Sequence, residues 1–253
     1  VSDPAEAQVQ VQRRRPPIQN RRASHGRAVL QLLQVQRAGV WSLEPQVAVL
    51  ISPGQAEPAI QATALHELGH AFGLWGYDDK GSEYFTLRIR NLETGEDLAD
   101  VIENTGGGGA WAPDGKSFFY TLQDDNHRPL KTFRHALGTE QSADTLVYEE
   151  KDTGKFTGVG KTNSEKWITI SIHDHDTSEI WLIDAENPDA TPRLVAPRVE
   201  GIEYDIEHRA DQFIIKTNEG GAEDYKLVTA PVSDPRKENW TDLIPHRPGV
   251  FIV

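Results

Sequence analysis

Four strand-like segments recur along the chain about every 46 to 48 residues, and this spacing constrains the fold more than any other feature of the sequence. They are Tyr84 to Asn91, Lys131 to Leu137, Glu179 to Asp184 and Tyr225 to Ala230. A polar turn and a second β-rich stretch lie between consecutive segments: Ser117 to Leu122, Trp167 to Ile172 and Gln212 to Thr217. A repeat of about 40 to 50 residues with several short strands is typical of a β-propeller blade, which buries its faces only against neighbouring blades.

The repeats occupy residues 80–253, enough for about three and a half blades. We therefore predict a mainly β fold, a partial β-propeller of about three to four blades at 79–253, preceded by a small α+β segment at 27–78 with one zinc-motif helix. Residues 1–26 form a third region. They are rich in Gln, Arg and Pro and lack hydrophobic periodicity, so we expect a disordered basic leader.

Charge supports this division. Residues 1–40 hold seven arginines against Asp3 and Glu6, a net charge of +5, so −18 remains for the rest of a chain whose total is −13. The basic leader has no interleaved aromatic residues, and we predict no nucleic-acid partner. No apolar run reaches about 18 residues, so no membrane partner is expected either. A chain that starts at Val1 and contains no Met is expected to be part of a longer gene product.

The segment at 27–78 begins with two stretches rich in Val and Leu, at 28–36 and 40–51, which we interpret as neighbouring strands. From Pro58 the apolar residues Ile60, Ala64, Leu65, Leu68 and Phe72 recur at helical spacing. We interpret Ala64 to Gly76 as a zinc-binding helix packed against those strands. His66 and His70 stand four residues apart, so on a helix both imidazoles can reach one metal ion, with Glu67 as general base.

The sequence HELGHAFG resembles the opening of the metzincin zinc peptidases, and GLWG resembles the matrixins among them; the resemblance covers residues 28–76. In that family a third ligand follows the glycine by three positions, which here is Gly76, and a Met-containing turn lies beneath the metal. Asp78 and Asp79 are the nearest replacements. The resemblance implies zinc as a cofactor, held by His66, His70 and Asp78, and weakly if the third ligand is missing.

From about Tyr77 to Val253 the chain is similar to the propeller of oligopeptidase B, in the prolyl oligopeptidase family of serine peptidases. The residues that carry this are GSEYFTLRIRNLETGEDL, AWAPDGKSFFYTLQDDNHRP, ISIHDHDTSEIWLID and ENWTDLIPHRPGVFI. The resemblance implies that the propeller covers an α/β-hydrolase domain and restricts access to short peptides. It also implies basic peptides as substrates, and a missing hydrolase domain or a second chain to complete the propeller.

The chain has no Gly-x-Ser-x-Gly pentapeptide, so no serine triad is predicted, and Ser117 and Ser171 are interpreted as strand hydroxyls. His173 to Asp176 is expected to be a solvated turn between blades, and Gly106 to Gly109 a blade connection. Trp111, Trp167 and Trp181 are expected to anchor the packing of the blades.

Three functions remain open from the sequence: the gating propeller of a serine oligopeptidase, a zinc metallopeptidase, and a non-catalytic binding module that pairs through an open propeller edge. Whether the chain itself is an enzyme stays open. The lack of Cys and of a signal peptide favours the cytoplasm.

Overall fold

The computed structural model describes residues 26–37, 40–51, 72–92 and 94–252. Two 12-residue strands come first, β1 (Gly26–Arg37) and β2 (Val40–Ile51), and they pair antiparallel from Gly26↔Ile51 to Arg37↔Val40. This confirms the two predicted neighbouring strands. Residues 1–25 of the basic leader predicted at 1–26 lie outside the described residues, as do the predicted zinc-helix residues up to Ala71, and Gly26 already belongs to β1.

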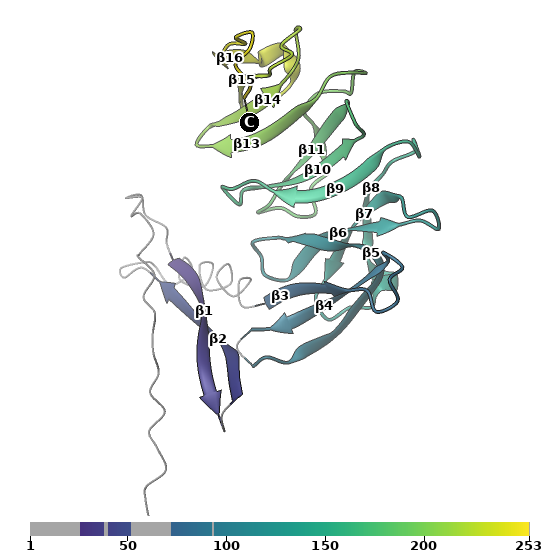
Figure 1. Cartoon of the computed structure of the whole chain (residues 1–253), viewed down its shortest axis with the longest axis vertical. Coiled ribbons are helices and arrows are strands. Elements are labelled where there is room, and N and C mark those ends of the chain that lie inside the picture. Colours follow the sequence, from purple (N-terminus) through teal and green to yellow (C-terminus); the bar gives the residue numbers. More distant parts are fainter. Residues whose placement is uncertain (1–25, 38–39, 52–71, 93, 253) are drawn as a thin grey trace, which may run out of the picture.

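The remaining strands form three sheets that stack in sequence order, from β3 at one end to β16 at the other (Figure 1). One sheet has the order β3-β4-β5-β6-β7-β8, and two have four strands each, β12-β11-β10-β9 and β13-β14-β15-β16. The strands of the first sheet are β3 (Phe72–Tyr77), β4 (Phe85–Asn91), β5 (Asp97–Trp111), β6 (Ser117–Gln123), β7 (Pro129–Ala136) and β8 (Thr145–Glu149). Those of the second are β9 (Phe156–Lys161), β10 (Trp167–His173), β11 (Ser178–Asp184) and β12 (Arg193–Leu194). Those of the third are β13 (Tyr204–Arg209), β14 (Gln212–Thr217), β15 (Lys226–Pro231) and β16 (Thr241–Ile244).

The long strand β5 joins two blades. Its first half pairs with β4, from Arg90↔Asp97 to Phe85↔Thr105, and its second half pairs with β6, from Gly109↔Tyr120 to Trp111↔Phe118. A register shift lies between Thr105 and Gly109. We therefore count a three-stranded blade 1 (β3, β4 and the first half of β5) and a four-stranded blade 2 (the second half of β5, β6, β7 and β8). Blade 3 is β9 to β12, and blade 4 is β13 to β16, which confirms the predicted partial propeller.

Hydrophobic clusters fill the spaces between consecutive blades. Leu87 and Ile89 of blade 1 pack with Phe118 and Tyr120 of blade 2, while Phe119 of blade 2 packs with blade 3 through Ile168, Ile170 and Ile172. Blades 3 and 4 meet through Ile180, Leu182, Tyr204, Ile206, Phe213 and Ile215. Trp111, Trp167 and Trp181 each pack against one of these clusters, as predicted. The propeller is thus held together by side chains that alternate between the two faces of each sheet.

Aspartates begin several of the hairpin turns, because a carboxylate can accept hydrogen bonds from backbone N–H groups that the strands leave unpaired. Asp114 accepts from Lys116 N and Ser117 N, Asp124 from Asn126 N and Arg128 N, and Asp174 from Asp176 N and Thr177 N. These bonds set the strand ends where the sequence predicts them.

Three predictions are corrected. The predicted helix over Ala64 to Gly76 is wrong for its last residues, because Phe72–Tyr77 forms strand β3, paired with β4 from Phe72↔Asn91 to Tyr77↔Thr86. The partner strand decides this, since Phe72 and Leu74 reach the blade 1 core only from an extended backbone. Within the described residues there is no α-helix, only the short 3-10 helices η1 (Gln141–Ala143) and η2 (Lys237–Asn239).

Gly106 to Gly109 is not a connection between blades, because these glycines lie inside β5. Their lack of side chains permits close packing: a Cβ at Gly109 would lie 2.6 Å from the backbone oxygen of Phe119. The turn at His173 to Asp176 is also misplaced. It joins β10 to β11 within blade 3 rather than linking two blades.

The predicted domain boundary at residues 78/79 falls in the turn of the β3–β4 hairpin. Among the helices of the part that the structure describes, none is long and apolar enough to cross a membrane.

Candidate functional site

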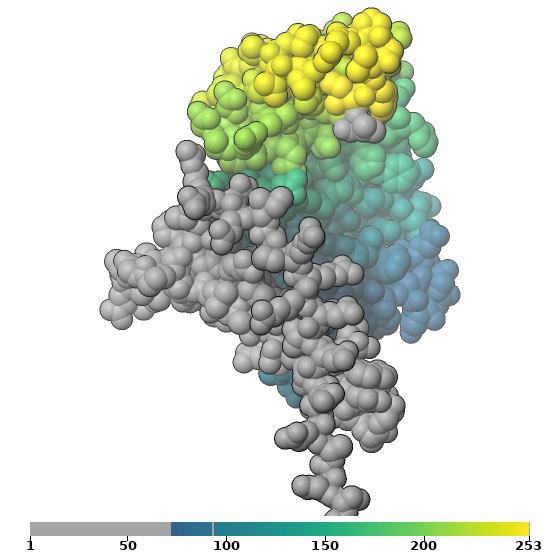
Figure 2. Space-filling model, turned by 60° about the vertical axis from the view of Figure 1, so that its left-hand side comes forward, coloured from purple at the N-terminus to yellow at the C-terminus, as the bar shows by residue number. Residues whose placement is uncertain are grey.

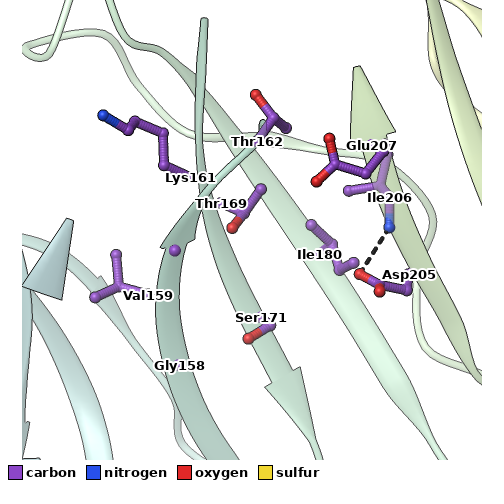
Figure 3. Close-up of a pocket in the computed structure, with 11 residues that line it drawn as sticks. Gly158, Val159, Lys161, Thr162, Thr169, Ser171, Ile180, Asp205, Ile206 and Glu207 are labelled. Carbon is purple, nitrogen blue, oxygen red and sulfur yellow. Dashed lines mark hydrogen bonds between the residues drawn. The ribbon is translucent and has the colours of Figure 1, made fainter. Parts of the chain in front are cut away.

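An open cavity of about 230 Å³ lies between blades 3 and 4 (Figure 3). Its walls come from the edge strands β9 and β13, from β10 behind β9, and from Ile180 of β11. We call it the β9–β13 cleft. It is lined by Gly158, Val159, Gly160, Lys161, Thr162, Thr169, Ser171, Ile180, Asp205, Ile206 and Glu207. The first strand of a propeller blade is the one nearest the central channel, so the cleft lies on the channel side of the blades.

The cleft exists because β9 alternates glycine with larger residues. Gly158 pairs with Ser171 and Gly160 with Thr169 across the sheet, and no side chain on β9 covers either hydroxyl. A Cβ at Gly158 would lie 2.8 Å from Ser171 Oγ, and one at Gly160 would lie 3.1 Å from Thr169 Oγ1. Two hydroxyl groups that form no hydrogen bond among the described residues therefore face the open space.

Two carboxylates lie on the β13 side of the cleft. Asp205 and Glu207 stand two residues apart on the strand and so share one face. Glu207 accepts hydrogen bonds from Asn163 N and Asn163 Nδ2, both at 3.0 Å. Among the described residues, the Asp205 carboxylate accepts a hydrogen bond only from the backbone N of Ile206, at 2.8 Å (dashed in Figure 3), and this residue is exposed.

The cleft carries a net negative charge. Its one cation, Lys161, is paired with Glu165 at 3.0 Å. Neither Asp205 nor Glu207 forms a salt bridge with any of the residues that the structure describes, although Lys216 of β14 pairs with Asp205 in the strand register. Nearby, His208 accepts from or donates to Ser164 Oγ at 2.8 Å, and burial together with the charge of Lys166 lowers its pKa.

A second polar cluster lies around His135 in blades 1 and 2. Its ring is fully buried, with Nε2 3.0 Å from Asp100 Oδ1 and Nδ1 2.7 Å from Asp144 Oδ1. Tyr120 donates its hydroxyl to Asp144 Oδ2 at 2.8 Å, and burial, with the charge of Asp144 beside it, raises the pKa of this phenol. Both histidine contacts attract only if each ring nitrogen carries a proton or a carboxyl does. Because no part of His135 reaches solvent, the cluster is a structural link among β5, β7 and η1.

A third cluster links blades 2 and 3. Arg198 Nη2 donates to Glu150 Oε2 at 2.5 Å and to Glu179 Oε1 at 3.3 Å. Burial alone would raise the pKa of Glu150, but the hydrogen bonds from Arg198 and from Asp152 N hold that pKa below its ordinary value. Burial and the neighbouring Glu150 raise the pKa of Tyr148 to about 12. Both carboxylates are almost fully covered, so this cluster also serves packing rather than a ligand.

The predicted zinc ligands are only partly placed by the structure. His66, Glu67 and His70 lie outside the described residues. Asp78 begins the β3–β4 turn, where its carboxylate accepts hydrogen bonds from Lys80 N at 3.0 Å, Ser82 Oγ at 3.2 Å and Glu83 N at 2.6 Å. The Lys80 bond is the largest cause that lowers its pKa to about 2.

The other acidic and histidine side chains of the described part do not gather into a metal site. Among residues 72–92 and 94–252, no group of three His, Asp or Glu side chains is placed to hold a metal ion. Zinc binding by His66, His70 and Asp78 stays a prediction.

The two serines that were interpreted as strand hydroxyls do lie on strands. Ser117 is buried at the start of β6 and donates its hydroxyl to Asp114 Oδ2 at 3.0 Å. Ser171 faces the β9–β13 cleft. The sequence reasoning missed the cleft itself. The signal was present in Gly158-Val159-Gly160, where glycine at alternate positions of a strand leaves one face without side chains.

Comparison with known proteins places the propeller part of the chain. The model for the prolyl oligopeptidase N-terminal β-propeller domain matches residues 67–253. Dipeptidyl aminopeptidase BI from Pseudoxanthomonas mexicana is 36% identical over 176 residues, which are 69% of this chain and 24% of that protein. Protease 2 from Moraxella lacunata is 38% identical over 156 residues, 61% of this chain and 22% of that protein.

Solved structures agree. Oligopeptidase B from Leishmania major aligns with a TM-score of 0.66 and 30% identity over 70% of this chain and 25% of its own. The structure of oligopeptidase B from Trypanosoma brucei, at 24% identity and a TM-score of 0.61, shares the fold over 88% of this chain and 34% of its own. This chain spans about a quarter of the length of the curated relatives it matches. These matches support the propeller and give no support to a zinc-peptidase segment.

Proposed function

Because this chain belongs to the prolyl oligopeptidase family, whose N-terminal β-propeller domain it contains, we propose that it is the substrate-gating part of an oligopeptidase-B-like serine endopeptidase. In this role the propeller admits short peptides and keeps larger chains away from an α/β-hydrolase domain. Proteolysis is then the work of that hydrolase domain, and this chain selects what reaches it.

The observation that carries the proposal is the stack of blades, all of which lie within residues 67–253 that match the family's propeller domain. Successive blades pack against one another through hydrophobic clusters and so form a wall, in which the β9–β13 cleft opens between blades 3 and 4. A wall of this kind excludes large chains by size while short, extended peptides pass along its channel.

The charge of the chain favours basic peptides as the ones admitted. A net charge of −13 attracts cations over long range, and two acidic residues, Asp205 and Glu207, line the cleft.

The gating role is tested in a chimera. Residues 72–253 replace the matched segment of the Pseudoxanthomonas mexicana aminopeptidase, and cleavage of a tetrapeptide is compared with cleavage of a denatured domain-sized protein. We expect the tetrapeptide to be cleaved and the protein to be spared. A chimera that folds by circular dichroism and cleaves both equally fast would overturn the proposal, as would a folded chimera without activity.

A second candidate is a binding module, favoured by the open end of the stack. All four residues of β16 are exposed, including Leu243 and Ile244, and blade 4 forms one end of the molecule (Figure 2). An edge strand with free backbone groups can pair with another chain. Sedimentation analysis of the full chain tests this: a stable dimer that dissociates in Leu243→Lys supports pairing through β16, and a monomer excludes self-pairing.

The zinc metallopeptidase hypothesis rests on the HELGH motif alone, with His66 and His70 as ligands and Glu67 as base. It requires about one zinc ion per chain, abolished by His70→Ala. Purified chain that holds no zinc after dialysis against zinc, by elemental analysis, would rule it out. Location in the cytoplasm likewise stays a prediction, which fractionation of the source cells tests.

A further inference from the structure

We propose that the β9–β13 cleft is a subsite for the cationic side chain of a peptide that lies along the channel side of blades 3 and 4. The proposal deepens the gating role, because it gives the propeller a means to recognise a peptide by chemistry as well as by size. The proposal rests on the proposed gating function in one respect: that function is the reason why a peptide would reach the cleft.

The cleft offers acceptors that nothing in the described part of the chain uses. The hydroxyls of Ser171 and Thr169 face the space above Gly158 and Gly160, and one oxygen of the Asp205 carboxylate forms no hydrogen bond. A hydroxyl can donate or accept, but a carboxylate only accepts, so the set of three favours a ligand that is rich in donors. Ammonium and guanidinium groups carry donors and no acceptors, which makes them the matching class.

The charges around the cleft point the same way. Asp205 and Glu207 supply two negative charges, and the Nζ of Lys161 is occupied by Glu165 at 3.0 Å. The charged side chains that line the cleft, Asp205, Glu207 and Lys161, sum to a charge of −1, so the lining favours a cation over a carboxylate. The hydroxyls come from residues two apart on β10, about 7 Å along the strand, a span that a flat guanidinium covers better than a compact ammonium.

Size and access also fit. A volume of about 230 Å³ holds one long side chain but no folded element, and the cleft is open to solvent rather than closed. The glycines bring a bound side chain close to the backbone of β9, because no Cβ stands in the way at either position. No strand of the described residues pairs with the edge of β9 away from β10, so this edge can hold the backbone of an extended peptide beside the cleft.

The test uses the full 253-residue chain and three blocked tripeptides, acetyl-Gly-X-Gly-amide, with X as arginine, lysine or glutamine. Affinity is measured by calorimetry, and the site by shifts of the Gly158 and Gly160 amide signals in NMR spectra. We expect the arginine peptide to bind best, the lysine peptide more weakly and the glutamine peptide not at all. Equal binding of all three, or shifts elsewhere only, would overturn the proposal.

Asp205→Asn removes the charge and keeps the shape of the side chain. We expect this substitution to weaken binding of the arginine peptide by about tenfold. Ser171→Ala should weaken binding of the arginine peptide less, since this substitution removes one hydroxyl acceptor and no charge. The matched control is Asp211→Asn, which removes the same charge from the exposed turn between β13 and β14. If both aspartate variants weaken binding equally, the attraction is general to the acidic surface and the subsite does not exist.

The outcome is separable from that of the gating test. A chimera that spares large proteins while Asp205→Asn has no effect on peptide binding keeps the gating role and removes the subsite. Peptide binding that depends on Asp205, in a propeller whose chimera cleaves short and long chains alike, keeps the subsite and removes the gating role.

Discussion

The His135 cluster and the β9–β13 cleft contain similar polar side chains, but those of the cluster are buried and hydrogen-bonded, whereas those of the cleft are open to solvent. Around His135, two carboxylates and a tyrosine hydroxyl are buried and bonded to one another, with Gly138 N also donating to Asp100. In the cleft, two hydroxyls and a carboxylate remain open toward solvent. The comparison teaches that residue type alone does not mark a binding site; acceptors that the fold leaves without a donor do.

The largest expected effect is on the closed cluster. His135→Ala takes a hydrogen-bond partner from each of two buried carboxyl groups, Asp100 and Asp144, and leaves a cavity in place of the ring, which together cost about 3–5 kcal/mol. We expect the free energy of unfolding, measured in urea, to fall by that amount. The control is His175→Ala in the exposed β10–β11 turn, which should change it by less than about 0.5 kcal/mol. Similar values for the two variants would contradict the structural role of His135.

Arg198→Ala is expected to rank second, at about 2–4 kcal/mol, since Glu150 and Glu179 are buried but Arg198 itself is partly exposed. The loss should depend on pH. The pKa of Glu150 is held low in the folded chain, so its contribution is present above its unfolded pKa and is lost as the pH falls through the folded value. Urea unfolding of the variant and the parent should therefore converge toward acid pH, and a difference that is constant with pH would argue against the Glu150 pairing.

Asp205→Asn tests the open cleft in the same way. Because this carboxylate is exposed and, within the part of the chain that the structure describes, accepts only from Ile206 N, we expect the free energy of unfolding to change by less than about 0.5 kcal/mol. Peptide affinity should change in the same variant. A large loss of stability, found by the same urea measurement, would place Asp205 among the structural carboxylates instead of the binding ones.

The smallest effect concerns the turn carboxylates. The backbone bonds from Lys80 and Glu83 lower the pKa of Asp78 to about 2, against the desolvation that would raise it. Its contribution to stability is thus present above its unfolded pKa and disappears only as the pH falls through about 2. Carbon-detected NMR titration of the carboxyl groups checks this. An Asp78 midpoint near its ordinary value would mean that the turn leaves the carboxylate free, as zinc ligation requires.

Much of the blade pattern was predictable. β4, β7, β11 and β15 lie where the recurrent segments place them, and β6, β10 and β14 follow their polar turns. These strands could be predicted because two local signals mark them: the alternation of side chains along a strand and an aspartate at the turn. Strand β3 was missed because Phe72 also fits the helical period of Ile60 to Leu68, and only pairing with β4 distinguishes a strand from a helix here.

The candidate sites were harder to predict from the sequence than the fold. His135 lies 35 residues from Asp100 in sequence, and no local pattern relates them. The zinc motif, by contrast, was the strongest local signal, yet the match to the propeller family begins at residue 67, inside that motif. A local motif reveals only sites whose residues are neighbours in the sequence. The clusters found in the blades join residues from different strands, which no local motif shows.

By itself, the sequence determined the strands, their turns and the repeated blade, because each of these depends on residues a few positions apart. Only the tertiary structure decided which polar groups are satisfied. Stacking blade 2 against blade 1 enclosed His135 between two carboxylates, and stacking blade 4 against blade 3 left the hydroxyls above Gly158 and Gly160 facing Asp205 across open space. That difference depends on the distance between surfaces that meet only after the chain has folded, and packing sets that distance.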